Sequence, residues 1–217
     1  MTEAEWVAAT DPKLLLYGPV QWRPDLEQPV DLNPCHPRLD DERKLRLYAC
    51  ECFHRSFPQL VYAADRLAFD AAERFADGLI QAAELTTASR PCGGTALVLT
   101  YQPAIRAARS VVGGGAIRID HPAGTQVPLP GSTQCDLLRC IFGNPFRPVA
   151  FDPRWRSETA VALAAGIYDG RHFDRLPILA DALEDAGCDA VELLNHLRGP
   201  GPHARGCWAV DAVLGRE

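Results

Sequence analysis

The sequence of 217 residues lacks any apolar run that approaches the roughly 18 residues needed to cross a membrane. It also opens with MTEAEW, which is not the basic segment followed by an apolar run that a secretory leader has. These two absences predict a protein without a secretory leader or a membrane partner. We therefore expect a cytoplasmic location.

The sequence lacks an excess of positive charge. Its 22 Lys and Arg residues are outnumbered by 28 Asp and Glu residues, which gives a formal net charge of -6. A general nucleic-acid-binding protein normally concentrates Lys and Arg for phosphate contacts, so a nucleic-acid partner is not expected. The 47% hydrophobic and 23% charged residues are typical of a folded protein.

Two nucleotide-binding motifs are also missing. The glycine run 113–115 is not followed by the Gly-Lys-Ser or Gly-Lys-Thr ending of a phosphate loop, and the pair Gly93-Gly94 lacks the spacing of a dinucleotide turn. We interpret these glycines as hairpin or loop residues that supply positive φ angles.

What the sequence does contain is helical periodicity over most of its length. Apolar residues recur at helical spacing and stop at glycine or proline. Beyond two short helices near the N-terminus, this pattern predicts helices over residues 40–57, 58–78, 80–85, 132–142, 157–168, 173–186, 189–198 and 202–215.

Two stretches interrupt this pattern. Prolines make residues 18–39 an irregular surface segment, and residues 91–131 form a Gly/Pro-rich irregular insertion that could contain short strands. The predicted fold class is therefore mainly α, a multi-helix, bundle-like single domain over residues 1–217.

Eight cysteines and six histidines give the sequence its clearest chemistry. In a reducing compartment such cysteines are core residues, metal ligands or reactive thiols rather than disulfides. His203 and Cys207 are four residues apart, and so are Cys50 and His54, so each pair would share one face of a helix. Two such pairs on facing helices would supply the four ligands of a zinc site, with His196 as a substitute ligand.

Two other interpretations of the cysteines stay open. No Cys-x-x-Cys motif is present, so the cysteines could simply pack in the core, as free cysteine usually does. Cys188 follows Gly187 just before a predicted helix, and a helix N-terminus lowers a thiol pKa, which suits a cysteine nucleophile.

Four segments resemble blocks of an uncharacterised, multi-copy bacterial protein family. They are residues 43–50 (RKLRLYAC), 141–149 (IFGNPFRPV), 176–188 (LPILADALEDAGC) and 201–208 (GPHARGCW). The family pattern after the first block is similar to Ala-Cys-x-Cys-Cys-Arg-Arg. Cys50 and Cys52 match this pattern, whereas Phe53 and His54 depart from it. If the family bound a metal there through three cysteines, this member would have to use His54 as a substitute or lose a ligand.

No catalytic constellation is evident, and the resemblance implies no known activity. The sequence therefore predicts a non-catalytic interaction or regulatory module with a protein partner. A structural zinc-binding helical protein and a cysteine-dependent enzyme remain as alternatives. The expected cofactor is accordingly zinc or none.

Overall fold

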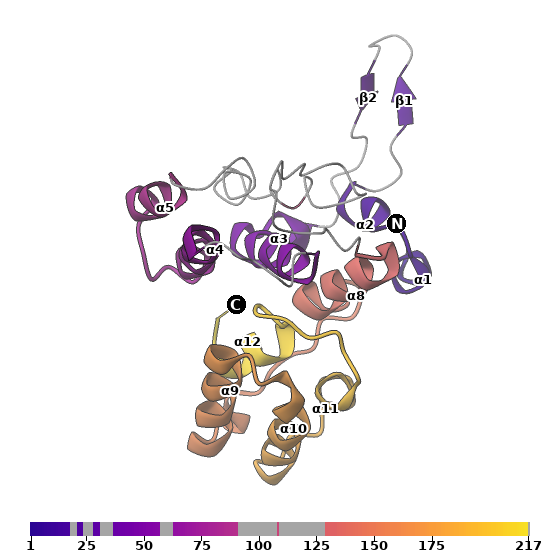
Figure 1. The fold of residues 1–217 in the computed structure, drawn as a ribbon. Helices are drawn as coiled ribbons and strands as arrows, with labels where there is room; N and C mark the ends of the chain where they lie inside the picture. The colour runs from indigo at the N-terminus through magenta and orange to yellow at the C-terminus, as the bar shows by residue number, and fades with distance from the viewer. Residues whose placement is uncertain are drawn as a thin grey trace. The chain divides into compact units, whose positions relative to one another are not determined.

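The protein is mainly α-helical, as the sequence predicts, and the helices are shown in Figure 1. The computed structural model describes residues 1–17, 21–23, 28–30, 37–56, 63–90, 108 and 129–216. The irregular insertion predicted at residues 91–131 therefore lies almost wholly outside the described residues.

The chain forms two compact units, residues 1–138 and 139–217, where the sequence analysis expected one domain. Each unit has its own cluster of buried apolar side chains. Because a hydrophobic core is what makes a domain compact, two separate cores account for the division.

The N-terminal segment begins with helix α1 (Glu3–Ala8), whose start carries a capping box formed by Thr2 and Glu5. Helix α2 (Pro12–Tyr17) follows. Within the stretch predicted to be irregular, strands β1 (Gln21–Arg23) and β2 (Gln28–Val30) pair antiparallel. A 3-10 helix, Pro37–Asp40, closes this stretch. A proline, Pro29, is tolerated in this short two-stranded ribbon. The other residues of 18–36 lie outside the described residues, so the prediction of an irregular segment there stays a prediction.

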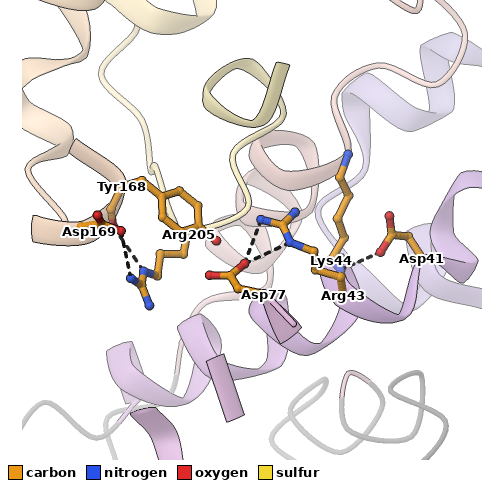
Figure 2. Close-up of polar contacts among 7 residues, drawn as sticks. All are labelled: Asp41, Arg43, Lys44, Asp77, Tyr168, Asp169 and Arg205. Carbon is orange, nitrogen blue, oxygen red and sulfur yellow. Dashed lines mark hydrogen bonds and ion pairs between the residues drawn. The ribbon is translucent and has the colours of Figure 1, made fainter. Parts of the chain in front are cut away.

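Helix α3 (Glu42–Ser56) is the central element of the first unit. All nine residues 45–53 are buried, so the helix is covered on every face. It contacts α4 (Ala63–Ala76), which in turn contacts α5 (Ala82–Ser89). The Arg43 side chain donates from Nε to Asp77 Oδ1 at 3.0 Å, which ties the start of α3 to the end of α4 (Figure 2). The predicted helix start at Pro58 lies outside the described residues.

Helix α8 (Gly131–Phe142) spans the boundary between the two units in the sequence, and four further α-helices and two 3-10 helices, Pro153–Trp155 and Phe173–Arg175, belong to the second unit. The four α-helices are α9 (Glu158–Gly170), α10 (Leu176–Asp185), α11 (Val191–Arg198) and α12 (Trp208–Leu214). Helix α9 contacts α10 and α12, and α11 also contacts both α10 and α12. The four helices therefore close a ring of contacts around the buried cluster.

Helix ends in this unit follow from particular residues. Ser157 caps α9 by accepting a hydrogen bond from Ala160 N–H at 3.2 Å. After α10, Gly187 adopts a φ of +86°, and the backbone bonds from Gly187 to Glu184 and from Cys188 to Leu183 form a Schellman motif. The predicted helix end at Gly187 is confirmed.

Two predicted helix starts were wrong. Residues 202–207 form a loop, and α12 begins only at Trp208. The reason is the pair Gly201 and Gly206, whose φ angles of +86° and +81° turn the chain away from helical geometry. The next helix upstream, α11, takes Ala190 rather than Asp189 as its N-cap.

The core of the second unit explains part of the cysteine content. Cys140, Cys188 and Cys207 belong to its buried cluster, and Cys50, Cys52 and Cys135 are buried in the first unit. The prediction that these six cysteines are buried is confirmed. Among the residues that the structure describes, no helix combines the length and apolar character of a membrane span.

Candidate metal site

Four side chains of the second unit converge on one point. Cys140 lies in the last turn of α8, His196 lies in the last turn of α11, His203 lies in the loop that follows, and Cys207 is the N-cap of α12. We call these four residues the Cys2His2 group. One ligand atom from each residue lies within 4.8 Å of the ligand atoms of the other three.

Two contacts in the group join a cysteine sulfur to a histidine nitrogen. His196 Nε2 lies 3.2 Å from Cys207 Sγ, and His203 Nδ1 lies 3.8 Å from Cys140 Sγ. The two imidazole rings stand perpendicular to each other, with centroids 5.0 Å apart. Each sulfur therefore has a histidine nitrogen within 3.8 Å.

These distances fit one tetrahedral metal ion. Zinc binds sulfur at about 2.3 Å and nitrogen at about 2.0 Å, so tetrahedral ligand atoms lie roughly 3.3 to 3.8 Å apart. The two sulfur–nitrogen distances of 3.2 and 3.8 Å match this spacing, and ligand atoms as far apart as 4.8 Å would need to move closer by about 1 Å to bind the same ion. A single ion would satisfy all four ligands.

A hydrogen bond outside the group fixes the orientation of His203. Its Nε2 lies 3.1 Å from the carbonyl oxygen of Gly199, which can only accept a hydrogen bond. The proton therefore resides on Nε2, and the lone pair of Nδ1 points toward Cys140. Metal-binding histidines characteristically donate their second ring N–H to a carbonyl or carboxylate in this way.

The group is largely closed to solvent. Cys140, His203 and Cys207 are buried, and His196 is half-buried. Burial by itself raises the pKa of the Cys207 thiol, but its hydrogen bonds with Cys140, His196 and His203, together with the charge of His196, outweigh the effect of burial. They hold the pKa of this thiol well below its ordinary value, so its thiolate form is favoured.

Charge balance also favours a divalent ion. Two cysteine thiolates and two neutral histidines carry a charge of -2, which one divalent cation neutralises. A buried site of this kind leaves no net charge in the core, so the large cost of burying an unpaired ion is avoided.

Arg205 anchors the loop that carries His203 and Cys207. Its Nε donates to the carbonyl oxygen of Tyr168 at 3.2 Å, and its guanidinium lies 4.9 Å from the centroid of the Tyr168 ring (Figure 2). A second, longer contact of 3.9 Å reaches Asp169. The loop is thereby fixed to the C-terminal end of α9.

Three of the predicted metal ligands belong to this group, and two do not. His203 and Cys207 come together as expected, and the substitute ligand His196 joins them. Cys50 and His54 belong to the first unit, where Cys50 is packed in the cluster between α3 and α4.

The surroundings of His54 are those of a side chain that links two helices. Its Nε2 lies 3.8 Å from Glu73 Oε1, and its ring packs on Phe69. Both partners lie on α4, so His54 on α3 contacts the neighbouring helix through both its polar edge and its ring face.

The sequence-based reasoning missed Cys140 as a ligand. It lies 63 residues before His203, so no local spacing could reveal their contact. The available signal was its position in the last turn of a helix that ends at Gly143. This position brings a buried side chain to the end of the helix where a loop can meet it.

Comparisons with protein-family models, with curated proteins and with solved structures found no match for this chain.

Proposed function

We propose that the second unit is a helical interaction module stabilised by a structural zinc ion, bound by the Cys2His2 group. The observation that carries the proposal is the convergence of four ligand atoms within 4.8 Å of one another. Two thiolates and two imidazoles form one of the common ligand sets of structural zinc.

The number of ligands supports a structural rather than a catalytic ion. Catalytic zinc sites usually combine three protein ligands with a water molecule or substrate, whereas structural sites are closed by four protein ligands. Here four side chains are available, and three of them are buried. No coordination position is left for a substrate, which supports a binding module over an enzyme.

The compactness of the group supports one ion rather than a two-iron cluster. In the two-iron clusters that use two cysteines and two histidines, the cysteines bind one iron and the histidines bind the other. In this chain a histidine nitrogen lies 3.2 Å from one sulfur and 3.8 Å from the other. Such short sulfur–nitrogen distances suit ligands of one centre.

Metal content is the direct test. Untagged protein purified without chelator should contain about one equivalent of zinc by plasma mass spectrometry, as a closed four-ligand site predicts. Cys140→Ala and Cys207→Ala should lose most of it. Cys188→Ala is the matched control, because this cysteine is buried in the same unit but lies outside the group.

His172→Ala is the matched control for His196→Ala and His203→Ala, because His172 is an exposed histidine of the same unit. A folded, metal-free wild-type protein would contradict the proposal. So would equal zinc loss in the controls and in the ligand variants, because zinc would then depend on the fold in general rather than on four side chains.

A cysteine-dependent enzyme is the second candidate, and one contact favours it. His196 Nε2 lies 3.2 Å from Cys207 Sγ, which is the geometry of a cysteine nucleophile with its general base. However, the Cys207 side chain has 0% exposure, so a substrate could not reach the sulfur. Rapid alkylation of Cys207 in the folded protein as purified, before any chelator is added, would favour this candidate over zinc.

Cys188 is the other suggested nucleophile, and its thiol pKa is shifted in the opposite direction to that of Cys207. Burial raises the pKa of its thiol, which outweighs the hydrogen bond it accepts from the backbone of Ala190. A thiol that resists ionisation is a poor nucleophile. Cys188 therefore contributes to the packing of the core.

A further inference from the structure

The four ligands of the Cys2His2 group differ in their access to solvent. Cys140 is 1% exposed, Cys207 is 0% exposed and His203 is 9% exposed. His196 alone among the four is half-buried. A chelator or a competing ligand would therefore approach the ion on the side of His196.

Trp208 packs on that side of the group. Its ring centroid lies 5.2 Å from the centroid of the His196 ring, with the two planes tilted by 46°. Trp208 directly follows Cys207, so its backbone is held at the start of α12, next to a ligand. The indole is thus in contact with the one ligand that is accessible.

The Trp208 indole also lies against the backbone of Gly143. A Cβ atom added at Gly143 would lie 3.2 Å from Trp208 Cγ and 3.4 Å from Cδ1, so the absence of a side chain lets the indole lie close against the backbone. Gly143 follows α8, the helix that carries Cys140. The indole therefore packs between the end of one ligand-bearing helix and the ring of a ligand from another.

We propose that Trp208 is a positioning residue that covers His196 and slows exchange of the bound ion. This inference rests on the proposed zinc site and names a residue that limits the rate at which the ion is exchanged. The apolar shell around a metal site governs solvent access, so a large aromatic ring over the exposed ligand restricts entry of a competing ligand. Trp208 contacts His196 but supplies no ligand atom, so its removal should change the rate of release more than the equilibrium content.

The test measures zinc release from the full-length, zinc-loaded protein into an excess of a chromophoric chelator. Trp208→Ala should retain its zinc after purification but release it about tenfold faster or more, which is the scale on which residues around a metal site act. Trp208→Phe should restore slow release, because a ring still covers His196. Trp155→Phe is the control, since it alters a tryptophan of the same unit outside the group.

Each outcome decides the matter. If Trp208→Ala releases zinc at the wild-type rate, the inference is overturned. A folded Trp208→Ala protein that holds no zinc also overturns it, because Trp208 would then determine the affinity for zinc rather than the rate of its release. If Trp208→Ala does not fold, Trp208→Leu takes its place with the same expectation of faster release. Wild-type protein without zinc would refute the proposed site itself, whereas zinc-loaded protein with unchanged rates would refute only the role of Trp208.

Discussion

Removing zinc should lower the melting temperature of the second unit by a large and calculable amount. Structural zinc sites bind with an apparent free energy of about 12 kcal/mol, within the measured range for zinc-finger peptides. This corresponds to a dissociation constant of about 1 nM. Zinc buffered at about 1 μM is then about a thousandfold above the dissociation constant, and it stabilises the folded state by about 4 kcal/mol.

This free energy converts to a shift in melting temperature through the size of the unit, which is residues 139–217. For a domain of this size, each 1 kcal/mol shifts the melting temperature by about 4 to 8 °C. The zinc-bound unit should therefore melt about 15 to 30 °C above the chelated unit. The buried cluster formed by α9 to α12 lets the metal-free unit retain a folded state from which to melt.

Differential scanning calorimetry of the full-length protein is the appropriate assay, because it separates the transitions of the two units. The zinc-dependent transition should move in wild-type protein and in Cys188→Ala, and it should stay at its low, metal-free position in Cys207→Ala. A wild-type transition that is unchanged by chelator would refute the reasoning. A zinc-dependent shift in Cys207→Ala equal to that of wild type would also refute it.

Three further outcomes are expected. Gly143→Ala should lower the free energy of unfolding by about 1 to 2 kcal/mol in denaturant titrations, because its φ of +72° disfavours a side chain, whereas Gly166→Ala, in open space on α9, should not. Arg198 lowers the pKa of Glu184 by hydrogen bonding, so Arg198→Met should raise that pKa toward its ordinary value in an NMR titration. The stabilisation from this pair is present above the unfolded-state pKa of Glu184 and is lost as pH falls through the lowered folded-state value. Chelation should expose both ligand thiols to iodoacetamide, as mass spectrometry can show, while zinc-loaded protein resists.

Helices could be predicted from the sequence because their signals are local. The apolar spacing and the stop at Gly187 lie within a few residues of the helix that they define, and the structure confirms that end. The division into two units could not be predicted in this way. It depends on which apolar faces share a core, and both units present similar buried, alanine-rich helix faces to their own neighbours.

The candidate site was partly predictable for a related physical reason. His203 and Cys207 were selected as a pair because a helix would place residues four apart on one face. The structure brings them together through a loop instead, with a backbone bond from Cys207 N–H to the carbonyl of Ala204 at 3.1 Å. The pair was thus predicted from the four-residue spacing of a helix face, although the backbone between the two residues is not helical. Cys140 shares no local spacing with either residue and could be found only from the fold.

The eight residues 201–208 show how a short string can specify such a site. Two positions supply ligands, two glycines supply the positive φ angles that keep the segment out of a helix, and an arginine anchors it to α9. The last position, Trp208, places an indole against the half-buried His196. The loop makes few regular backbone hydrogen bonds of its own, so its conformation depends on these side chains. The proposed zinc ion would join His203 and Cys207 of this loop to Cys140 at the end of α8 and His196 at the end of α11, which is why we expect its removal to act on stability first.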